Sequence, residues 1–209
     1  MQKIERVVEY LHELYPEPEC ELKFNSEFEM FVAVLLSPQC TDKRVNMVTK
    51  ELFKTANTPE QVLAMGQTEL EKRIYSTGFY KNKAKNLILS SQMLLQEFGG
   101  KLPKEVEQLV QLPGAGRKVA NVIAALAHGA NTFAVDTHVF RVTNRLGLVK
   151  AKTPDETERK FVAKYSKYIT PDLHLSLVLF GRYICTAKNP KCAECRLRDV
   201  CDGQNSPLR

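Results

Sequence analysis

The sequence has no run of five or more like charges, so it carries no basic tail. Lys and Arg outnumber Asp and Glu by 30 to 24, and the net charge of +6 is compatible with a nucleic-acid partner without requiring one. The longest apolar run, MFVAVLL, is far shorter than the roughly 18 residues that indicate a membrane span. The amino terminus, MQKIERVVEYLHELY, has charged residues throughout its apolar pattern and does not resemble a signal peptide. We therefore expect a cytoplasmic protein that does not bind membranes.

Alternating apolar and polar runs bounded by hairpin turns are also absent, which argues against a β-sheet fold. Apolar residues recur instead at spacings of three and four, as in Val119, Val122, Ile123 and Leu126. Helix starts are marked by capping boxes, and prolines follow several of the caps at the first helical position. The boxes are Ser26 with Glu29, Thr58 with Gln61, Thr68 with Glu71, and Thr153 with Glu156. The pattern predicts an all-α protein of about ten helices.

The stretch LPGAGRKVAN, residues 112–121, joins two of these predicted helices through a turn with two glycines. Glycine supplies a positive φ, and without Cβ atoms the backbone N–H groups of Gly114 and Gly116 can approach a ligand closely. The amino-terminal end of a helix binds anions, and a phosphate there would lie beside Arg117. An ordinary corner between two helices with solvated cations is the alternative interpretation.

Lys118 is the second cation of this turn. A free lysine has a pKa of roughly 10.4, so an uncharged amine near pH 7 requires about 4 kcal/mol from its surroundings. The helix dipole contributes only about 0.3–1 kcal/mol at an exposed end. The position alone therefore does not make Lys118 a nucleophile, and a partner that takes up its proton is needed.

Asp136, in the segment FAVDTHVFRVTNRLG, is a candidate for that partner. It precedes an apolar helical pattern, so it is also expected to be a helix N-cap, and the two roles are compatible because a cap holds the carboxylate rigidly. An ionised Asp136 would raise the pKa of a neighbouring lysine, so it helps by accepting the proton or by stabilising positive charge on a sugar. His138 is interpreted either as a polar residue on the helix face or as a phosphate contact.

Four of the six cysteines, Cys185, Cys192, Cys195 and Cys201, stand in the spacing C-x6-C-x2-C-x5-C. In a cytoplasmic chain four thiolates within such a short segment indicate a metal site. Their chemistry suits zinc, the usual metal of a small structural four-cysteine site, and also a [4Fe–4S] cluster. Basic residues surround them, and Lys191 and Arg196 are candidates for phosphate contacts. Cys20 and Cys40 are expected to be small buried residues.

These motifs together resemble the endonuclease III family of helix-hairpin-helix DNA-repair glycosylases. The resemblance covers nearly the whole chain in order, through LPGAGRKVAN, VDTH, the cysteine spacing, LLSPQCTD (residues 35–42) and STGFYKNKAKNL (residues 76–87). It implies a [4Fe–4S] cluster rather than zinc, with a structural role. It also implies that Lys118 and Asp136 are catalytic, and that Gln39 and Phe79 enter the duplex when the damaged nucleotide leaves. A loop glutamine and a core aromatic are the respective alternatives.

The resemblance further implies two helical lobes with a DNA-binding cleft between them. One lobe would comprise residues 21–130 and end in the helix-hairpin-helix, and the other residues 1–20 plus 131–209, with the cluster loop at 185–201. The expected activity is removal of oxidised pyrimidines from double-stranded DNA and β-elimination at the abasic site through a lysine Schiff base. We expect a monomer associated with the nucleoid. The alternatives are a monofunctional adenine-mismatch glycosylase, which would lack a lysine at position 118, and a metal-stapled DNA-binding module without catalysis.

Overall fold

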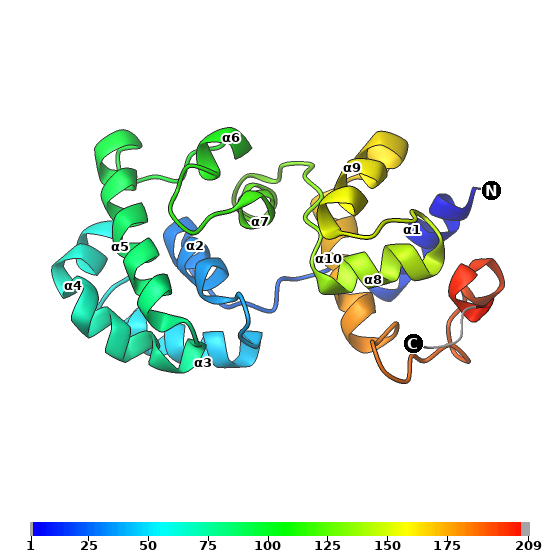
Figure 1. Ribbon diagram of the computed structural model, residues 1–209, viewed down its shortest axis with the longest axis horizontal. Coiled ribbons are helices and arrows are strands. Elements are labelled where there is room, and N and C mark those ends of the chain that lie inside the picture. The colour runs from blue at the N-terminus through cyan, green and yellow to red at the C-terminus, as the bar shows by residue number, and fades with distance from the viewer. Residues whose placement is uncertain (1, 206–209) are drawn as a thin grey trace. The chain divides into compact units, whose positions relative to one another are not determined.

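The structure is a computed structural model that describes residues 2–205, and these residues form helices and turns with no strand. This confirms the all-α prediction. Ten α-helices occur in the described chain, together with four short 3-10 turns, η1 to η4 (Figure 1). The bounds of the α-helices are α1 Lys3–Leu14, α2 Glu27–Leu36, α3 Asp42–Leu52, α4 Pro59–Ile74, α5 Tyr80–Glu97, α6 Val106–Leu109, α7 Arg117–His128, α8 Thr137–Leu146, α9 Pro154–Tyr165 and α10 Pro171–Tyr183. The 3-10 turns are η1 Tyr75–Thr77, η2 Ser166–Tyr168, η3 Arg198–Val200 and η4 Asp202–Asn205.

The chain divides into two compact units. One is Cys20–His128, and the other combines Met1–Glu19 with Gly129–Arg209. The boundaries expected from the sequence, after residues 20 and 130, fall one and two residues later than these. None of the helices in residues 2–205 is both long enough and apolar enough to cross a membrane.

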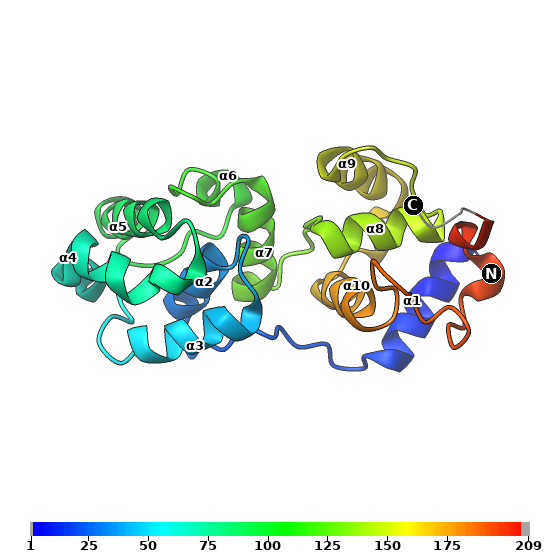
Figure 2. The ribbon, with the colours of Figure 1, turned by 60° about the horizontal axis from the view of Figure 1, so that its bottom comes forward.

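The unit of residues 20–128 is built around α2, which lies between α5 and α7 (Figures 1 and 2). Every residue of α2 from Phe28 to Leu36 is buried, so this helix packs on all sides. The buried carboxylate of Glu29 accepts hydrogen bonds from the backbone N–H of Asn25 at 2.6 Å and from its side chain at 3.0 Å. These bonds satisfy the charge at the helix start, so the apolar helix can be buried from its first turn.

The other unit has its own apolar core, in which α10 packs against both α1 and α8. Phe133 and Phe161 stack with ring centroids 4.0 Å apart, and Tyr10 meets Phe180 edge to face. Leu197 is fully buried in the same core and belongs to the cysteine segment, residues 185–201. The cysteine segment is therefore anchored to the unit by an apolar side chain.

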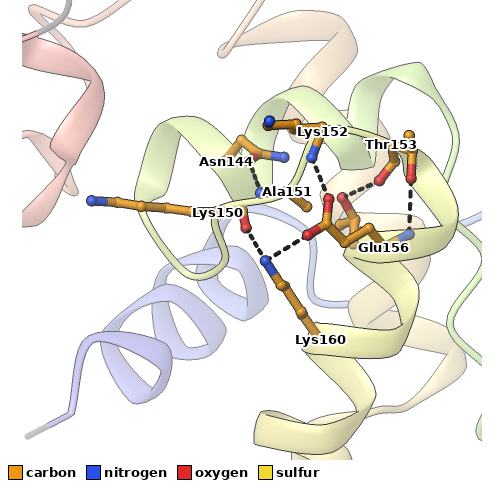
Figure 3. Close-up of polar contacts among 8 residues, drawn as sticks. Asn144, Lys150, Ala151, Lys152, Thr153, Glu156 and Lys160 are labelled. Atoms are coloured by element: carbon orange, nitrogen blue, oxygen red, sulfur yellow. Dashed lines mark hydrogen bonds and ion pairs between the residues drawn. The ribbon is translucent and has the colours of Figure 1, made fainter.

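The predicted caps are confirmed at Ser26, Thr58 and Thr153, each of which accepts a hydrogen bond from the N–H three residues on. At α9 the carboxylate of Glu156 also binds the Lys152 N–H and the Lys160 ammonium, both at 2.7 Å (Figure 3). The cap predicted at Thr68 is wrong. The helical geometry breaks two residues earlier, at Gly66 with a φ of 73°, because glycine adopts this conformation without strain.

Candidate functional site

The glycine turn joins α6 to α7. Gly114 has a φ of 84°, as expected, but Gly116 does not have a positive φ, so that part of the expectation is wrong. A Cβ at Gly116 would meet no atom within 4 Å, so this side of the turn is open to a ligand. The first helical hydrogen bond of α7 runs from Ala120 N to Gly116 O at 2.9 Å. The preceding N–H groups therefore lie at the helix end, where anions bind.

Lys118 is exposed, one residue after the exposed Arg117 at the start of α7. Its ammonium makes no hydrogen bond or ion pair with any residue between 2 and 205. The side chain is therefore available to an incoming substrate at the end of the helix that favours an anion.

The glycine turn is anchored to α5. A Cβ at Gly114 would lie 2.8 Å from Nδ2 of Asn86, so only glycine allows this close approach. One helical turn further along α5, the hydroxyl of the buried Ser90 donates to the Pro113 carbonyl at 2.8 Å. The turn is thus held from one face of α5 while its other side stays open.

Gln39 and Phe79 have left-handed backbones, with φ values of 56° and 48°. This conformation costs about 1–2 kcal/mol for a residue with a Cβ, and such strain is concentrated at functional sites. Phe79 is 65% exposed, which excludes the core interpretation. Both residues and Gly114 line one cavity of about 320 Å³ in the unit of residues 20–128. The structure thus brings together three of the residues that the sequence singled out.

Lys83 also lines this cavity, and the sequence analysis did not identify it as a site residue. Its side chain is buried, and Nζ donates to the carbonyls of Leu36, Pro38 and Thr77 at 2.8, 2.9 and 2.8 Å. Burial lowers the pKa of this lysine. The signal available in the sequence was spacing, since Lys83 shares a helix face with the buried Leu87 and Leu94.

Asp136 is the N-cap of α8, as predicted. Its Oδ1 accepts from the N–H groups of His138 at 2.8 Å and Val139 at 2.7 Å. Within residues 2–205 no hydrogen bond to Oδ2 is formed, so one oxygen fixes the carboxylate and the other remains available. Lys118 belongs to the unit of residues 20–128 and Asp136 to the other unit.

His138 is in the first turn of α8, on the side that faces Gly181 of α10. A Cβ at Gly181 would be 2.8 Å from the His138 Cβ, so the two helices are in close contact here. The His138 Nδ1 is 3.3 Å from Nη2 of Arg141, which donates to the Gly181 carbonyl at 2.7 Å. In this unit the ring therefore takes part in helix packing.

Two arginines of α8 hold the start of the cysteine segment, and neither was singled out in the sequence. Arg141 donates through Nε to the Cys185 carbonyl at 3.0 Å. Arg145 donates to the carbonyls of Thr186 and Ala187 at 2.6 and 3.0 Å. Because these acceptors are backbone atoms, no motif of residue types could have indicated them.

The four cysteines of the segment line a cavity of about 520 Å³ together with Arg145 and other residues. Burial raises the pKa of the Cys195 and Cys201 thiols, and the neighbouring thiols raise it further. In residues 2–205 no three His, Cys, Asp or Glu side chains are arranged to hold a metal ion. The cavity is, however, far larger than the about 10–15 Å³ that one water needs, and a multi-atom cluster suits four thiols around such a space. The donor set therefore fits an iron–sulfur cluster.

The remaining cysteines and basic residues differ in their surroundings. Cys20 and Cys40 are half-buried rather than buried as expected, and both lie outside the helices. Lys191 is exposed. Arg196 forms an ion pair with Glu13 of α1 and lies over the Tyr10 ring at 5.5 Å. A phosphate would therefore compete with Glu13 for Arg196 but not for Lys191.

Comparison with known families identifies two segments. Residues 32–167 match the HhH-GPD superfamily of base excision DNA repair proteins, and residues 185–201 match the iron–sulfur binding domain of endonuclease III. The second match confirms the iron–sulfur interpretation over zinc.

Curated proteins similar to the chain are also endonucleases III. The protein of Bacillus subtilis (strain 168) is 44% identical over 206 residues, 98% of this chain and 94% of that protein. The protein of Escherichia coli (strain K12) is 40% identical over 204 residues, with 97% of both chains covered.

Two solved structures of endonuclease III with DNA are similar to the chain over nearly its whole length. The structure of a trapped endonuclease III–DNA covalent intermediate, an estranged-adenine complex, superposes with a TM-score of 0.91 at 38% identity, covering 98% of both chains. A non-covalent endonuclease III–DNA complex gives the same TM-score and identity, covering 98% of this chain and 97% of that one.

Proposed function

The chain belongs to the endonuclease III family of HhH-GPD base excision DNA repair proteins, and from this premise we propose the roles of its residues and its substrate. It is a DNA glycosylase and abasic-site lyase that carries a [4Fe–4S] cluster. We propose that it removes oxidised pyrimidines from double-stranded DNA, that Lys118 is the nucleophile, and that Cys185, Cys192, Cys195 and Cys201 hold the cluster. The observation that carries the proposal is the position of Lys118, exposed and without a partner in residues 2–205, at the open end of α7.

The proposed reaction begins when the flipped nucleotide presents its sugar to Lys118. The N–C1′ bond forms as the glycosidic bond breaks, and the departing base takes up a proton. The sugar ring then opens to a Schiff base, which acidifies the C2′ protons. Removal of one C2′ proton expels the 3′ phosphate, and water releases the lysine from the shortened sugar.

Asp136 is proposed as the group that accepts the lysine proton or stabilises the positive charge that develops on the sugar. The cap bonds to Oδ1 support this role, because they hold the carboxylate while Oδ2 stays available. Phosphates on either side of the lesion would bind the open N–H groups of the glycine turn and the exposed Arg117. When bound, the cluster holds the segment 185–201 in shape, and Lys191 would contact a phosphate from there.

Borohydride trapping tests the nucleophile. The wild-type protein should form a reduced covalent complex with abasic DNA, and Lys118→Gln should form none. Lys85→Gln, which removes an equal charge from an exposed site, is the control and should trap like wild type. Equal trapping by Lys118→Gln and wild type would show that another amine reacts.

A cleavage assay over damaged duplexes tests the substrate class. Oxidised pyrimidines should be cut faster than mispaired adenine. The chain has a lysine at position 118, which an adenine glycosylase of this fold is expected to lack. Faster excision of adenine than of any oxidised pyrimidine would contradict the proposed substrate. Sedimentation at micromolar concentration should show a monomer.

A further inference from the structure

Lys83 ties two loops together. The first loop, residues 37–41, follows α2 and carries Gln39, and the second, residues 75–79, precedes α5 and carries Phe79. Lys83 is only 6% exposed, and its three ammonium hydrogens have three carbonyl acceptors, two from residues 36–38 and one from Thr77. The lysine is therefore saturated and is not itself available to a substrate.

Among residues 2–205 no carboxylate forms an ion pair with this buried ammonium. Burial has the largest effect on the pKa of Lys83 and lowers it. A buried charge without an ion-pair partner is costly. The three hydrogen bonds offset this cost, and they fix the positions of three carbonyls from two separate segments.

The loops that Lys83 joins are the strained ones. Gln39 follows Pro38, whose carbonyl accepts from Nζ, and Phe79 lies two residues after Thr77. Both have left-handed backbones that residues with a Cβ adopt only when their surroundings enforce it. Both residues line the same cavity, which Lys83 also lines.

The same face of α5 holds the glycine turn. Asn86 and Ser90 follow Lys83 by three and seven residues, which places the three on one side of the helix. Asn86 packs against Gly114, and Ser90 donates to the Pro113 carbonyl. One helix face thus sets the two loops and the turn in a fixed arrangement.

We propose that Lys83 is a positioning residue that joins the Gln39 and Phe79 loops, so that both side chains enter the duplex together as one rigid unit. The inference rests on the proposed glycosylase function and on the insertion of Gln39 and Phe79 into DNA that the family resemblance implies. Without Lys83 the loops move independently, and the arrangement that favours the flipped nucleotide forms less often. A misplacement of about 1 Å can cost about 100-fold in rate.

Lys83→Met tests the proposal, with Lys85→Met as the matched control on the exposed side of α5. Base removal from an oxidised pyrimidine in duplex DNA should fall about 10- to 100-fold in kcat, with KM changed by less than about threefold. The fluorescence of 2-aminopurine beside the lesion should rise more slowly on binding, because flipping is impaired. Base removal by Lys83→Met at the rate of Lys85→Met would overturn the proposal.

A double-mutant cycle separates positioning from loss of folding. In a protein that already carries Gln39→Ala and Phe79→Ala, Lys83→Met should lower base removal by less than about twofold. A full additive loss would overturn the proposal. Rates are normalised to the active fraction trapped by borohydride on a preformed abasic site, and Lys83→Gln replaces Lys83→Met if the latter does not fold. If Lys118→Gln still traps, the nucleophile is wrong, whatever the cycle shows.

Discussion

At the scale of single residues, Asp136 combines a structural bond and a proposed catalytic role in one carboxylate. The sequence predicted both roles, because a carboxylate before a helical pattern is a strong N-cap signal. The structure adds that Oδ1 accepts both cap bonds, so the proposed catalytic role falls to Oδ2. Substitutions that keep or remove the cap can therefore separate the two roles.

Asp136→Asn should keep the cap, because the asparagine carbonyl accepts the same two bonds. Its thermal midpoint should match wild type, while base removal should fall by about 100-fold or more. Asp136→Ala should lose the same activity and also about 1 kcal/mol of stability. Thermal denaturation and single-turnover excision measure the two effects. An active Asp136→Asn protein would limit Asp136 to capping.

The two glycines of the turn differ at the same scale, which the motif alone did not reveal. Gly114→Ala combines a φ of 84° with an overlap against Asn86, so it should lose at least about 1–2 kcal/mol of stability. Gly116→Ala meets open space without a positive φ, so its stability should be unchanged. If the turn binds phosphate, however, the added methyl should weaken DNA binding. Melting and a DNA titration of both variants test this, and unaltered binding by Gly116→Ala would contradict the phosphate site.

Lys83 shows why part of the site escaped sequence reasoning. A lysine is usually solvated, and its acceptors here are backbone carbonyls whose positions depend on the tertiary fold. Arg141 and Arg145 escaped for the same reason. Cysteine spacing and the glycine turn, by contrast, are local in the sequence and were recognised.

At the scale of elements, α1 is joined by two ion pairs to the cysteine segment, residues 185–201, and by a third to Asp202, which follows it. Lys3 binds Asp202 and Arg6 binds Asp199, both at 2.7 Å, and Arg196 binds Glu13. Apolar residues at spacings of three and four predicted α1, but only the fold places it beside residues 196–202. These exposed pairs are individually weak, and their joint effect is to restrain the segment.

Arg6→Gln should therefore speed the loss of cluster absorbance in a chelator by less than about fivefold. Arg73→Gln, which removes an exposed ion pair with Glu69 in the other unit, should leave the rate unchanged. The hydrogen bond from Arg6 lowers the pKa of Asp199 below its ordinary value of 3.8. A lowered carboxyl pKa contributes stability that is lost only as pH falls through the folded value, so the effect of Arg6→Gln should be constant from about pH 5 to about pH 8. A difference that vanishes within that range would contradict the ion pair.

At the scale of the whole molecule, the chain folds into two units with separate cores, and the amino-terminal helix belongs to the same unit as the carboxy-terminal half. Hydrophobic periodicity predicted the helices, but it contains no information on which helices share a core. The resemblance to a family supplied that grouping. The net charge of +6 likewise allowed DNA binding, and only the motifs made it an expectation.

Salt dependence measures the phosphate contacts of the whole molecule. Lys191→Gln should flatten the slope of log affinity against log salt by about one unit, because Lys191 is exposed. Arg196→Gln should flatten it less, because Glu13 already neutralises that guanidinium. Lys160→Gln, which removes a lysine paired with Glu156, is the control and should leave the slope unchanged. An unaltered slope in Lys191→Gln would restrict the segment to a structural role.

Peptide mapping of the borohydride-reduced complex tests the nucleophile most directly. After digestion of protein and DNA, mass spectrometry should find the sugar remnant on the peptide that contains Lys118, and on Lys118 itself. A remnant on any other lysine, or on the amino terminus, would contradict the account.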